Sequence, residues 1–479
     1  MEFQREKVEN ADVFLANIEK GENYVYSFLK ETEDGIYSTE LNNYARHNLY
    51  VGTAGILHMY VELYQVLKKE EYRTIIDKMT RFLENHVFDG METAGKEGEF
   101  VPGMSQAFYS GIGGIGLVLN EVYRLNGNIH AKNGALKVLK YYKNTLTETE
   151  EGIYWSGNSP IFFDGGIILF LIDCYNTYSG AAHEEEIACS NPSETDKRNS
   201  NHTDTAASED MQNQVECINQ ICAEMIRKGT DYILSHAIEH EGGAIEIDHL
   251  NVDFKHKEPN FEFGTAGAGY LFTKVYELTG DEKYLDAAKG TVNYLKSIAV
   301  RQKRGYLIPY KLGKYDNLFY LGNCHGPVGT AKLFYELYKV TGKEEYLSEV
   351  KALADGAHSL KAPFAQSAGF WNTTCICCGP AGYVPFYAGL YRATGDEMWR
   401  KLLHRVGEVL VGSRTGNHWN IAFDRTRPDD ITAPAGYFTG TAGIVTALLQ
   451  IYAIEKELGG ITGLIDDPYT SSTTDVRHR

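Results

Sequence analysis

Seven copies of one short pattern run along the chain, and this repetition constrains the fold more than any other feature. In each copy a turn of the form Gly-x-x-Gly leads into an apolar segment, and a tyrosine follows twelve residues after the first turn residue. One copy is degenerate, because it begins at Phe163 and keeps only Gly166. Repeats of this length indicate one architecture built from copies of a supersecondary unit, which must stack to bury a common core. The turns begin at Gly52, Gly111, Phe163, Gly264, Gly326, Gly379 and Gly440, and the tyrosines are Tyr64, Tyr123, Tyr175, Tyr276, Tyr338, Tyr391 and Tyr452.

Each copy has the pattern of a pair of helices. After the turn, a segment such as Thr330–Val340 places apolar side chains at helical spacing on one face. A short breaker follows, for example Thr279-Gly280-Asp281-Glu282, in which glycine ends the first helix and acidic residues favour the start of the second. Seven such pairs predict an all-α fold, an α/α toroid of seven helical-hairpin repeats with the more apolar helices in the inner ring. The turns should gather at one end, where glycine lets backbones approach closely.

The repeats account for nearly the whole length, so we expect a single toroid domain over residues 1–479. The one long interval between turns contains residues 183–214, a low-complexity stretch with almost no large apolar side chains. Such a segment cannot offset its ordering entropy, and we expect a flexible surface insertion. The polar tail over residues 466–479 is predicted to be frayed.

The charge and the cysteine usage limit the partners and the compartment. A net charge of -18 argues against nucleic acid and anionic membranes as partners. No stretch approaches the roughly 18 consecutive apolar residues that a membrane span needs, and no secretory signal is expected. The eight cysteines form no secreted-type disulfide framework. We therefore expect a cytoplasmic protein in which clustered cysteines serve metal ligation.

The residues just ahead of the turns carry the candidate chemistry. Copy five has Cys324-His325 in this place, and copy six has Cys377-Cys378. Three cysteines at equivalent positions of adjacent repeats indicate a metal site, and thiolates favour Zn²⁺ over magnesium or calcium. Three protein ligands with a fourth position left open are typical of catalytic zinc. The alternatives are a closed structural zinc with a fourth ligand such as Cys375 or His325, and buried thiols without a metal. The other copies have Tyr50-Val51, Tyr109-Ser110, Ile161-Phe162, Glu262-Phe263 and Phe438-Thr439.

These motifs resemble those of the lanthionine synthetase C (LanC) family. The pattern Gly322-Asn323-Cys324-His325-Gly326-Pro327-Val328-Gly329, followed by Cys377-Cys378-Gly379-Pro380-Ala381-Gly382, is similar to the family's zinc-binding motifs, and all seven turns are present. The resemblance implies a seven-fold helical toroid with zinc held by Cys324, Cys377 and Cys378. It also implies a cyclase activity, in which a zinc-activated cysteine thiol adds to dehydroalanine or dehydrobutyrine and forms a thioether.

The resemblance also implies the partners. Bacterial members act within one dehydrated, cysteine-containing precursor peptide during lanthipeptide biosynthesis. Animal relatives instead join glutathione, a small thiol, to dehydrated residues of proteins. No dehydratase or kinase region accompanies the repeats in this sequence, so a separate dehydratase would have to supply the dehydrated substrate.

Three positions depart from the family's pattern. The second motif has Cys378 where the family has histidine, which resembles an all-cysteine variant of the zinc site. The family's active-site histidine falls on Phe263. Where the family has an aspartate in repeat three, this chain has Ser159, and the nearby Asp164 is offset from that position. The family's acid/base groups therefore have no direct counterparts in this chain.

Two nearby residues are the main candidates to replace those acid/base groups. Glu262 shares the cysteine offset in repeat four, so its carboxylate should point at the mouth of the toroid. His325 follows a metal ligand and suits a proton donor to the enolate that addition creates. Each is equally open to a purely structural role beside the ligands. The weaker candidates are His47, Tyr109, Asp164 and Tyr320.

Two other functions remain open from the sequence. A carbohydrate-acting α/α toroid enzyme needs paired carboxylates across the cavity. Only Glu262 and the offset Asp164 are available for that role, and it leaves the three cysteines unexplained. A non-catalytic, zinc-binding protein that holds a peptide or a thiol is the second alternative, and Phe263 in the histidine position is the feature that favours it.

Overall fold

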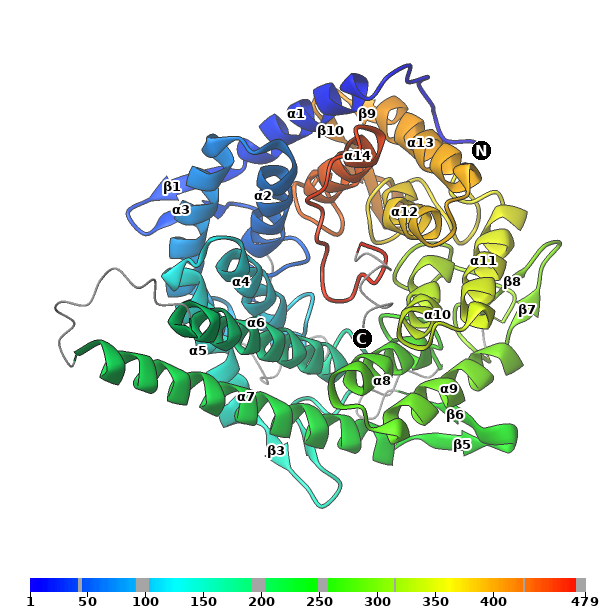
Figure 1. The fold of residues 1–479 in the computed structure, drawn as a ribbon. Helices are drawn as coiled ribbons and strands as arrows, with labels where there is room; N and C mark the ends of the chain where they lie inside the picture. Colours follow the sequence, from blue (N-terminus) through cyan, green and yellow to red (C-terminus); the bar gives the residue numbers. More distant parts are fainter. Residues whose placement is uncertain are drawn as a thin grey trace.

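A computed structural model describes residues 1–41, 45–91, 103–190, 203–248, 257–313, 316–424 and 427–470. The described chain is mainly helical and forms two concentric rings of helices, as Figure 1 shows. The predicted all-α, seven-hairpin toroid is confirmed. The inner ring consists of α2 (Thr53–Leu67), α4 (Ile112–Asn126), α6 (Asp164–Ser190), α8 (Thr265–Thr279), α10 (Pro327–Thr341), α12 (Tyr383–Thr394) and α14 (Thr441–Glu455). The outer ring contains α3 (Glu70–His86), α5 (Ile129–Thr145), α7 (Thr203–Ser235), α9 (Glu282–Ser297), α11 (Glu344–Ser359) and α13 (Glu397–Gly412).

The seventh outer helix comes from the other end of the chain. Helix α1 (Asp12–Tyr26) packs against α14, so the first helix completes the last repeat and closes the ring (Figure 1). The packing is close at Gly21, where an added Cβ would lie 2.6 Å from Cγ2 of Val445. The repeat pattern did not predict this helix, because α1 precedes the first Gly-x-x-Gly turn and carries no copy of it.

The repeated tyrosine lies in the last turn of six inner helices, whereas α6 continues past Tyr175 to Ser190. In repeat five the N–H of Gly342 donates to the carbonyl of Tyr338, and Gly342 adopts a left-handed conformation with φ of 67°. Glycine is favoured there because other residues rarely adopt that conformation. The outer helix begins directly afterwards, and in repeat four the carboxylate of Asp281 accepts the N–H of Lys283 at its start. The predicted glycine stop and acidic start are therefore both present.

Six short antiparallel hairpins were not predicted from the sequence; five follow a helix directly, and the sixth follows the hairpin after α13. The tip glycine of three of them lies against the outer helix of the next repeat. A Cβ on Gly35 would lie 2.1 Å from the carbonyl oxygen of Lys78, and one on Gly305 would lie 1.9 Å from that of Ala352. These three hairpins thus join neighbouring repeats on the outside of the toroid. They pair β1 (Leu29–Thr32) with β2 (Gly35–Ser38), β3 (Thr147–Glu148) with β4 (Ile153–Tyr154), β5 (Ile238–His240) with β6 (Ala244–Glu246), β7 (Val300–Arg301) with β8 (Tyr306–Leu307), β9 (Arg414–Thr415) with β10 (His418–Trp419), and β11 (Ile421–Asp424) with β12 (Arg427–Thr432).

Two segments expected to be flexible need separate accounts. The expected insertion at 183–214 includes the end of α6, which runs to Ser190, and the start of α7 at Thr203, while residues 191–202 lie outside the described chain. The expected fraying of the tail is wrong for residues 466–470, which enter the centre of the toroid (Figure 1). Asp466 there is only 2% exposed. Residues 471–479 lie outside the described chain.

Within the described ranges, no helix is both long enough and apolar enough to cross a membrane.

Candidate metal centre

The segments that precede the seven turns form a closed ring of backbone hydrogen bonds at one end of the toroid. In each repeat one residue lies in this ring, usually the residue two positions before the turn. In six repeats the N–H of the ring residue donates to the carbonyl of the ring residue in the next repeat. Repeat two differs, because Phe108 donates there instead of Tyr109. Repeat three places Phe162 in the ring, whereas the sequence alignment placed Ile161 there. The bonds are Tyr50 to Tyr109 (3.0 Å), Phe108 to Phe162 (3.2 Å), Phe162 to Glu262 (2.9 Å), Glu262 to Cys324 (3.1 Å), Cys324 to Cys377 (3.3 Å), Cys377 to Phe438 (3.0 Å) and Phe438 to Tyr50 (3.0 Å).

The second glycine of each turn makes this ring possible. A Cβ on Gly329 would lie 2.0 Å from the carbonyl oxygen of Asn323 and 2.8 Å from Cβ of Phe261 in the preceding repeat. A Cβ on Gly267 would likewise lie 2.0 Å from the carbonyl oxygen of Phe261. No side chain fits such gaps without a backbone shift. The second glycine therefore lets the segment before the turn pack directly against the first turn of the inner helix.

The ring brings the three predicted cysteines together. Sγ of Cys378 lies 3.3 Å from Sγ of Cys377 and 3.7 Å from Sγ of Cys324, and all three sulfurs lie within 4.8 Å of one another. Four ligands at the usual zinc–sulfur distance in a tetrahedron are about 3.8 Å apart, so the donor set suits zinc. Cys375 does not join this group, because its Sγ accepts a hydrogen bond from Oγ1 of Thr373 at 3.2 Å.

Tyr50 contributes a hydroxyl that the sequence reasoning missed. It occupies the ring position of repeat one, and its hydroxyl donates to Sγ of Cys377 over 3.1 Å. Burial and the nearby thiols raise the pKa of Tyr50 well above its usual value, so the hydroxyl keeps its proton. The signal was present in the sequence, since Tyr50 shares the offset of Cys324 and Cys377.

Glu262 lies beside the cysteines, as the sequence predicted. Its side chain is 1% exposed, and Nδ2 of Asn323 donates to its Oε1 at 3.4 Å. Burial raises the pKa of Glu262 to about 8, with Lys332 lowering it and Asp466 raising it. A carboxyl group with such a pKa is largely protonated at neutral pH and can donate a proton.

His325 turns towards a different partner. Its Nε2 lies 2.9 Å from Oε2 of Glu258, and its ring stacks on Phe263 with centroids 5.0 Å apart and an interplanar angle of 11°. Burial alone raises the pKa of Glu258, but His325 and Lys311 outweigh it and lower that pKa to about 2. Nδ1 of His325 is buried and has no hydrogen-bond partner among the described residues.

Asp164 does not meet the cysteines. Its carboxylate accepts the N–H groups of Trp155, Ser156 and Gly157 at 2.9–3.0 Å, and the Ser156 hydroxyl at 2.6 Å. These bonds hold the loop that leads into α6. Burial nevertheless raises the pKa of Asp164.

The three remaining weaker candidates are spread out. The hydroxyl of Tyr109 donates to Oδ2 of Asp466 over 2.8 Å in the interior. The ring of Tyr320 stacks on Tyr310 with centroids 3.7 Å apart. His47 is buried against Thr53, and burial lowers its pKa to about 4.

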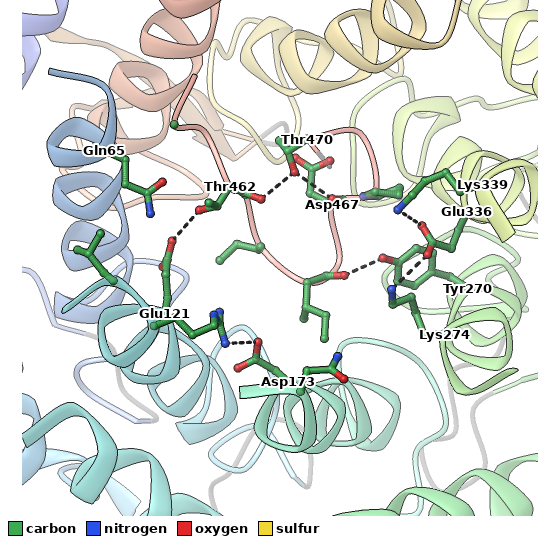
Figure 2. A pocket seen from close by; sticks show the side chains of 18 of the residues that line it. Gln65, Glu121, Asp173, Tyr270, Lys274, Glu336, Lys339, Thr462, Asp467 and Thr470 are labelled. Atoms are coloured by element: carbon green, nitrogen blue, oxygen red, sulfur yellow. Dashed lines mark hydrogen bonds and ion pairs between the residues drawn. The ribbon is translucent and has the colours of Figure 1, made fainter. Parts of the chain in front are cut away.

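A large cavity lies at the other end of the toroid. It has a volume of about 670 Å³. Its lining is charged: Arg124 pairs with Asp173, and Figure 2 shows Lys274 paired with Glu336. A second cavity of about 50 Å³ lies beneath the ring, where Asn323 and Phe438 line it. None of the ring residues lines the large cavity, so the cavity is separate from the candidate metal centre.

Comparisons with known proteins agree with this geometry. The sequence model of a family described as lanthionine synthetase C-like protein matches residues 44–459. Among solved structures, nisin cyclase is similar with a TM-score of 0.57 and 13% identity, over 95% of this chain and 96% of that chain. A family 76 glycoside hydrolase from a bovine Bacteroides thetaiotaomicron strain has a TM-score of 0.42 and 15% identity, over 92% of this chain and 77% of its own. No curated protein matches the sequence.

Proposed function

This chain belongs to the lanthionine synthetase C-like family, and from that premise we propose that it is a zinc-dependent, cyclase-like enzyme that forms thioethers. The proposed reaction adds a thiol to a dehydroalanine or dehydrobutyrine residue of a modified peptide. The observation that carries the proposal is the group of three cysteine sulfurs on adjacent repeats, within 4.8 Å of one another. Paired carboxylates across the cavity, which a glycosidase would need, are not part of this group.

The proposed zinc ligands are Cys324, Cys377 and Cys378. Their separations fit tetrahedral zinc, and three protein ligands leave a fourth position for a substrate thiol. Bound zinc would supply Lewis acidity, lowering the pKa of that thiol from about 8.5 so that thiolate is available at neutral pH. Tyr50 would hold Cys377 through its hydroxyl and limit the charge on that sulfur.

The residues of the chain must then move one proton. The new carbon–sulfur bond forms at the β-carbon of the dehydrated residue while its carbon–carbon π bond breaks, and the electron pair passes to the α-carbon. The proton lost by the thiol is balanced by a proton gained at the α-carbon. Glu262 is proposed to carry a proton beside the cysteines, and His325 to deliver one from the rim through its unpartnered Nδ1. The proposal gives Asp164 no proton, because the 155–157 loop engages its carboxylate.

The proposed partners follow from this chemistry. The electrophile is a dehydrated residue in a peptide, and the thiol is a cysteine of the same peptide or a small thiol such as glutathione. A dehydratase acting beforehand must supply the electrophile. A non-catalytic zinc protein is the second candidate, and Phe263 stacked on His325 where the family places its histidine favours it.

The ligand set is tested by metal content. We expect one zinc per purified chain, and we expect Cys324→Ala, Cys377→Ala and Cys378→Ala each to lose most of it, because two thiolates hold zinc poorly. Cys375→Ala is the matched control and should keep its zinc, since Cys375 is buried but outside the cluster. Full zinc in any of the first three variants would contradict the ligand set.

The reaction is tested with the zinc-loaded protein, a dehydroalanine peptide and glutathione or an internal cysteine. Mass spectrometry should show addition of one thiol, or ring formation without a mass change. If the zinc-loaded protein binds the peptide but never catalyses addition, the non-catalytic alternative replaces the proposal.

A further inference from the structure

The end of the described chain fills the middle of the toroid. After α14, residues 459–470, here called the C-terminal finger, enter the central channel from the end opposite the cysteines and fold back (Figures 1 and 2). The family match ends at residue 459, so the finger lies almost wholly beyond it. Among the described residues, the finger is the segment that separates the large cavity from the ring.

Side chains from several inner helices hold the finger. Glu62 on α2 accepts the N–H groups of Thr462 and Gly463 at 3.2 Å and 2.9 Å. The hydroxyl of Tyr270 on α8 donates to the carbonyl of Ile465 at 2.7 Å. The part of the finger that folds back is held as well, because Nη1 of Arg392 on α12 donates to the carbonyl of Tyr469 at 2.6 Å. Hydrogen bonds from α2, α8 and α12 therefore fix the position of the finger inside the toroid.

The tip of the finger carries a buried charge towards the ring. Asp466 is 2% exposed, and its Oδ2 lies 2.9 Å from Nζ of Lys332 and 2.8 Å from the hydroxyl of Tyr109. Its Oδ1 is buried and has no hydrogen-bond partner among the described residues. Asp466 and Lys332 both line the small cavity beneath the ring, together with Asn323.

That cavity connects the tip with the candidate metal centre. Asn323 directly precedes Cys324 and donates to Glu262, so one wall of the cavity is the cysteine segment itself. Lys332 is also buried, at 5% exposed. A buried ion pair contributes little net stability, because the desolvation of both charges offsets their attraction. Stability alone therefore does not explain why the Asp466–Lys332 ion pair lies beneath the cysteines.

We propose that the C-terminal finger forms the floor of the reaction site, and that Asp466 is a positioning residue that fixes Lys332 and Tyr109 beneath the three cysteines. This inference rests on the proposed function. Thiol addition places negative charge on the dehydrated residue, and fixed donors in a water-poor site stabilise such charge without reorganising. Asp466 holds the ammonium and the hydroxyl in one arrangement, so that they need not reorganise during the reaction.

Single and double substitutions separate positioning from stability. Asp466→Asn and Lys332→Met each leave the partner charge buried and unpaired, so each should lower the melting temperature. The double variant removes both charges and should recover most of the melting temperature. We expect thiol addition to fall about 10- to 100-fold in kcat in all three variants, with KM and zinc content unchanged. Asp429→Asn, on the exposed part of β12, is the control and should keep full activity.

The outcomes distinguish this inference from the proposed function. If activity returns in the double variant together with stability, the ion pair is only structural and the positioning role is overturned. If Asp466→Asn is as active as the unchanged protein, the inference also fails while the proposed function stands. If the unchanged, zinc-loaded protein adds no thiol, the proposed function fails and the inference fails with it.

A truncation tests the floor itself. Removal of residues 459–479 should abolish thiol addition while zinc stays bound, whereas removal of residues 471–479 alone should preserve it. A synthetic peptide of residues 459–470, added in trans, should restore activity to the longer truncation. Full activity without the finger would overturn the proposal. If the longer truncation fails to fold, the substitutions at Asp466 and Lys332 decide the question.

Discussion

At the scale of single residues, one position repeated seven times carries the candidate chemistry. The ring of backbone hydrogen bonds holds Tyr50, Glu262, Cys324, Cys377 and Phe438 at equivalent places around one mouth. Because backbone groups hold this ring in all seven repeats, different side chains can occupy its positions. A carboxyl group and two metal ligands therefore occupy adjacent copies of one structural position, and the hydroxyl donor Tyr50 occupies another copy, beyond Phe438.

The two proposed proton carriers give the prediction at this scale. Glu262→Gln and His325→Asn should each slow thiol addition by about a hundredfold, because one proton must move in every turnover. Both variants should keep their zinc, since neither residue is a proposed ligand. Kinetics with a dehydroalanine peptide, beside metal analysis of the same samples, would check this. Unchanged rates in both variants would remove these residues from the mechanism.

Phe263→His provides a separate control for the same hypothesis. The substitution returns the residue that the family has at this position, and a histidine can keep the stacking on His325. If the unchanged protein is inert and this variant is active, the chain is a zinc-binding relative that lost catalysis. If an active protein is left unchanged or impaired by the substitution, Glu262 and His325 remain the proton carriers.

At the scale of elements, the two glycine positions of each repeat serve different purposes. Gly329, in the first turn of α10, has backbone of the ring segment within contact distance of where its Cβ would be. Gly342, at the end of the same helix, has nothing within 4 Å but adopts a left-handed conformation. The first position requires glycine for space, and the second requires it for conformation.

These roles predict different costs for the same substitution. Gly329→Ala should lower the free energy of unfolding by about 3 kcal/mol, because the backbone of the cysteine segment must shift. Gly342→Ala should cost about 1 kcal/mol, the usual penalty for a left-handed alanine. Urea unfolding of both variants would measure the difference. Gly329→Ala should also weaken zinc binding, whereas Gly342→Ala should not, and equal effects at both sites would contradict this account of the turns.

The helices were predictable because they carry a signal that other elements lack. Apolar spacing over eleven or more residues, repeated seven times, identifies the inner helices from sequence alone. The hairpins have strands of two to six residues, too short for an alternating pattern to stand out. Their best signals were Asp34-Gly35 and Glu151-Gly152, each followed by Ile-Tyr, and repeated turn residues of this kind mark hairpins. The contact of three tip glycines with the outer helix of the next repeat depends on tertiary packing, which the sequence does not show.

At the scale of the whole molecule, the two ends of the chain close the outer ring and occupy the middle of the toroid. Helix α1 closes the outer ring beside α14, and the C-terminal finger fills the channel. Helix α1 contains no Gly-x-x-Gly pattern, and Gly460-Ile461-Thr462-Gly463 in the finger leads into no inner helix of the described chain. The glycine- and aspartate-rich finger has the composition of a loop, and its burial depends on partners far away in sequence, such as Glu62 and Lys332. The repeat pattern therefore placed the cysteines and Glu262 at one end of the toroid, but it gave no signal for the burial of Asp466, which lies outside the repeats.

The anchor of the finger makes the stability of the toroid depend on pH. Burial raises the pKa of Glu62 to about 7, with His58 lowering it and Glu121 raising it. Burial alone lowers the pKa of His58, but Glu121 and Glu62 raise it above its usual value. Asp466 is a further negative charge facing this group, and Thr462 and Gly463 donate to Glu62 from the finger. Both titrating groups thus hold protons more tightly in the folded state than in the unfolded state.

The sign of the pH effect follows from that difference. The folded protein keeps the Glu62 proton up to about pH 7, while the unfolded chain releases it near pH 4.5, so the free energy of unfolding falls as pH rises through this window. Glu62→Gln cannot titrate and keeps an oxygen acceptor for the finger, so its unfolding free energy should fall less between pH 5 and pH 8. Glu70→Gln, exposed at the start of α3, is the matched control and should follow the unchanged protein. Urea unfolding at four pH values would measure all three proteins. Parallel curves for Glu62→Gln and the unchanged protein would show that Glu62 holds no proton in the folded state beyond its ordinary range, and that the finger is anchored by a charged carboxylate throughout.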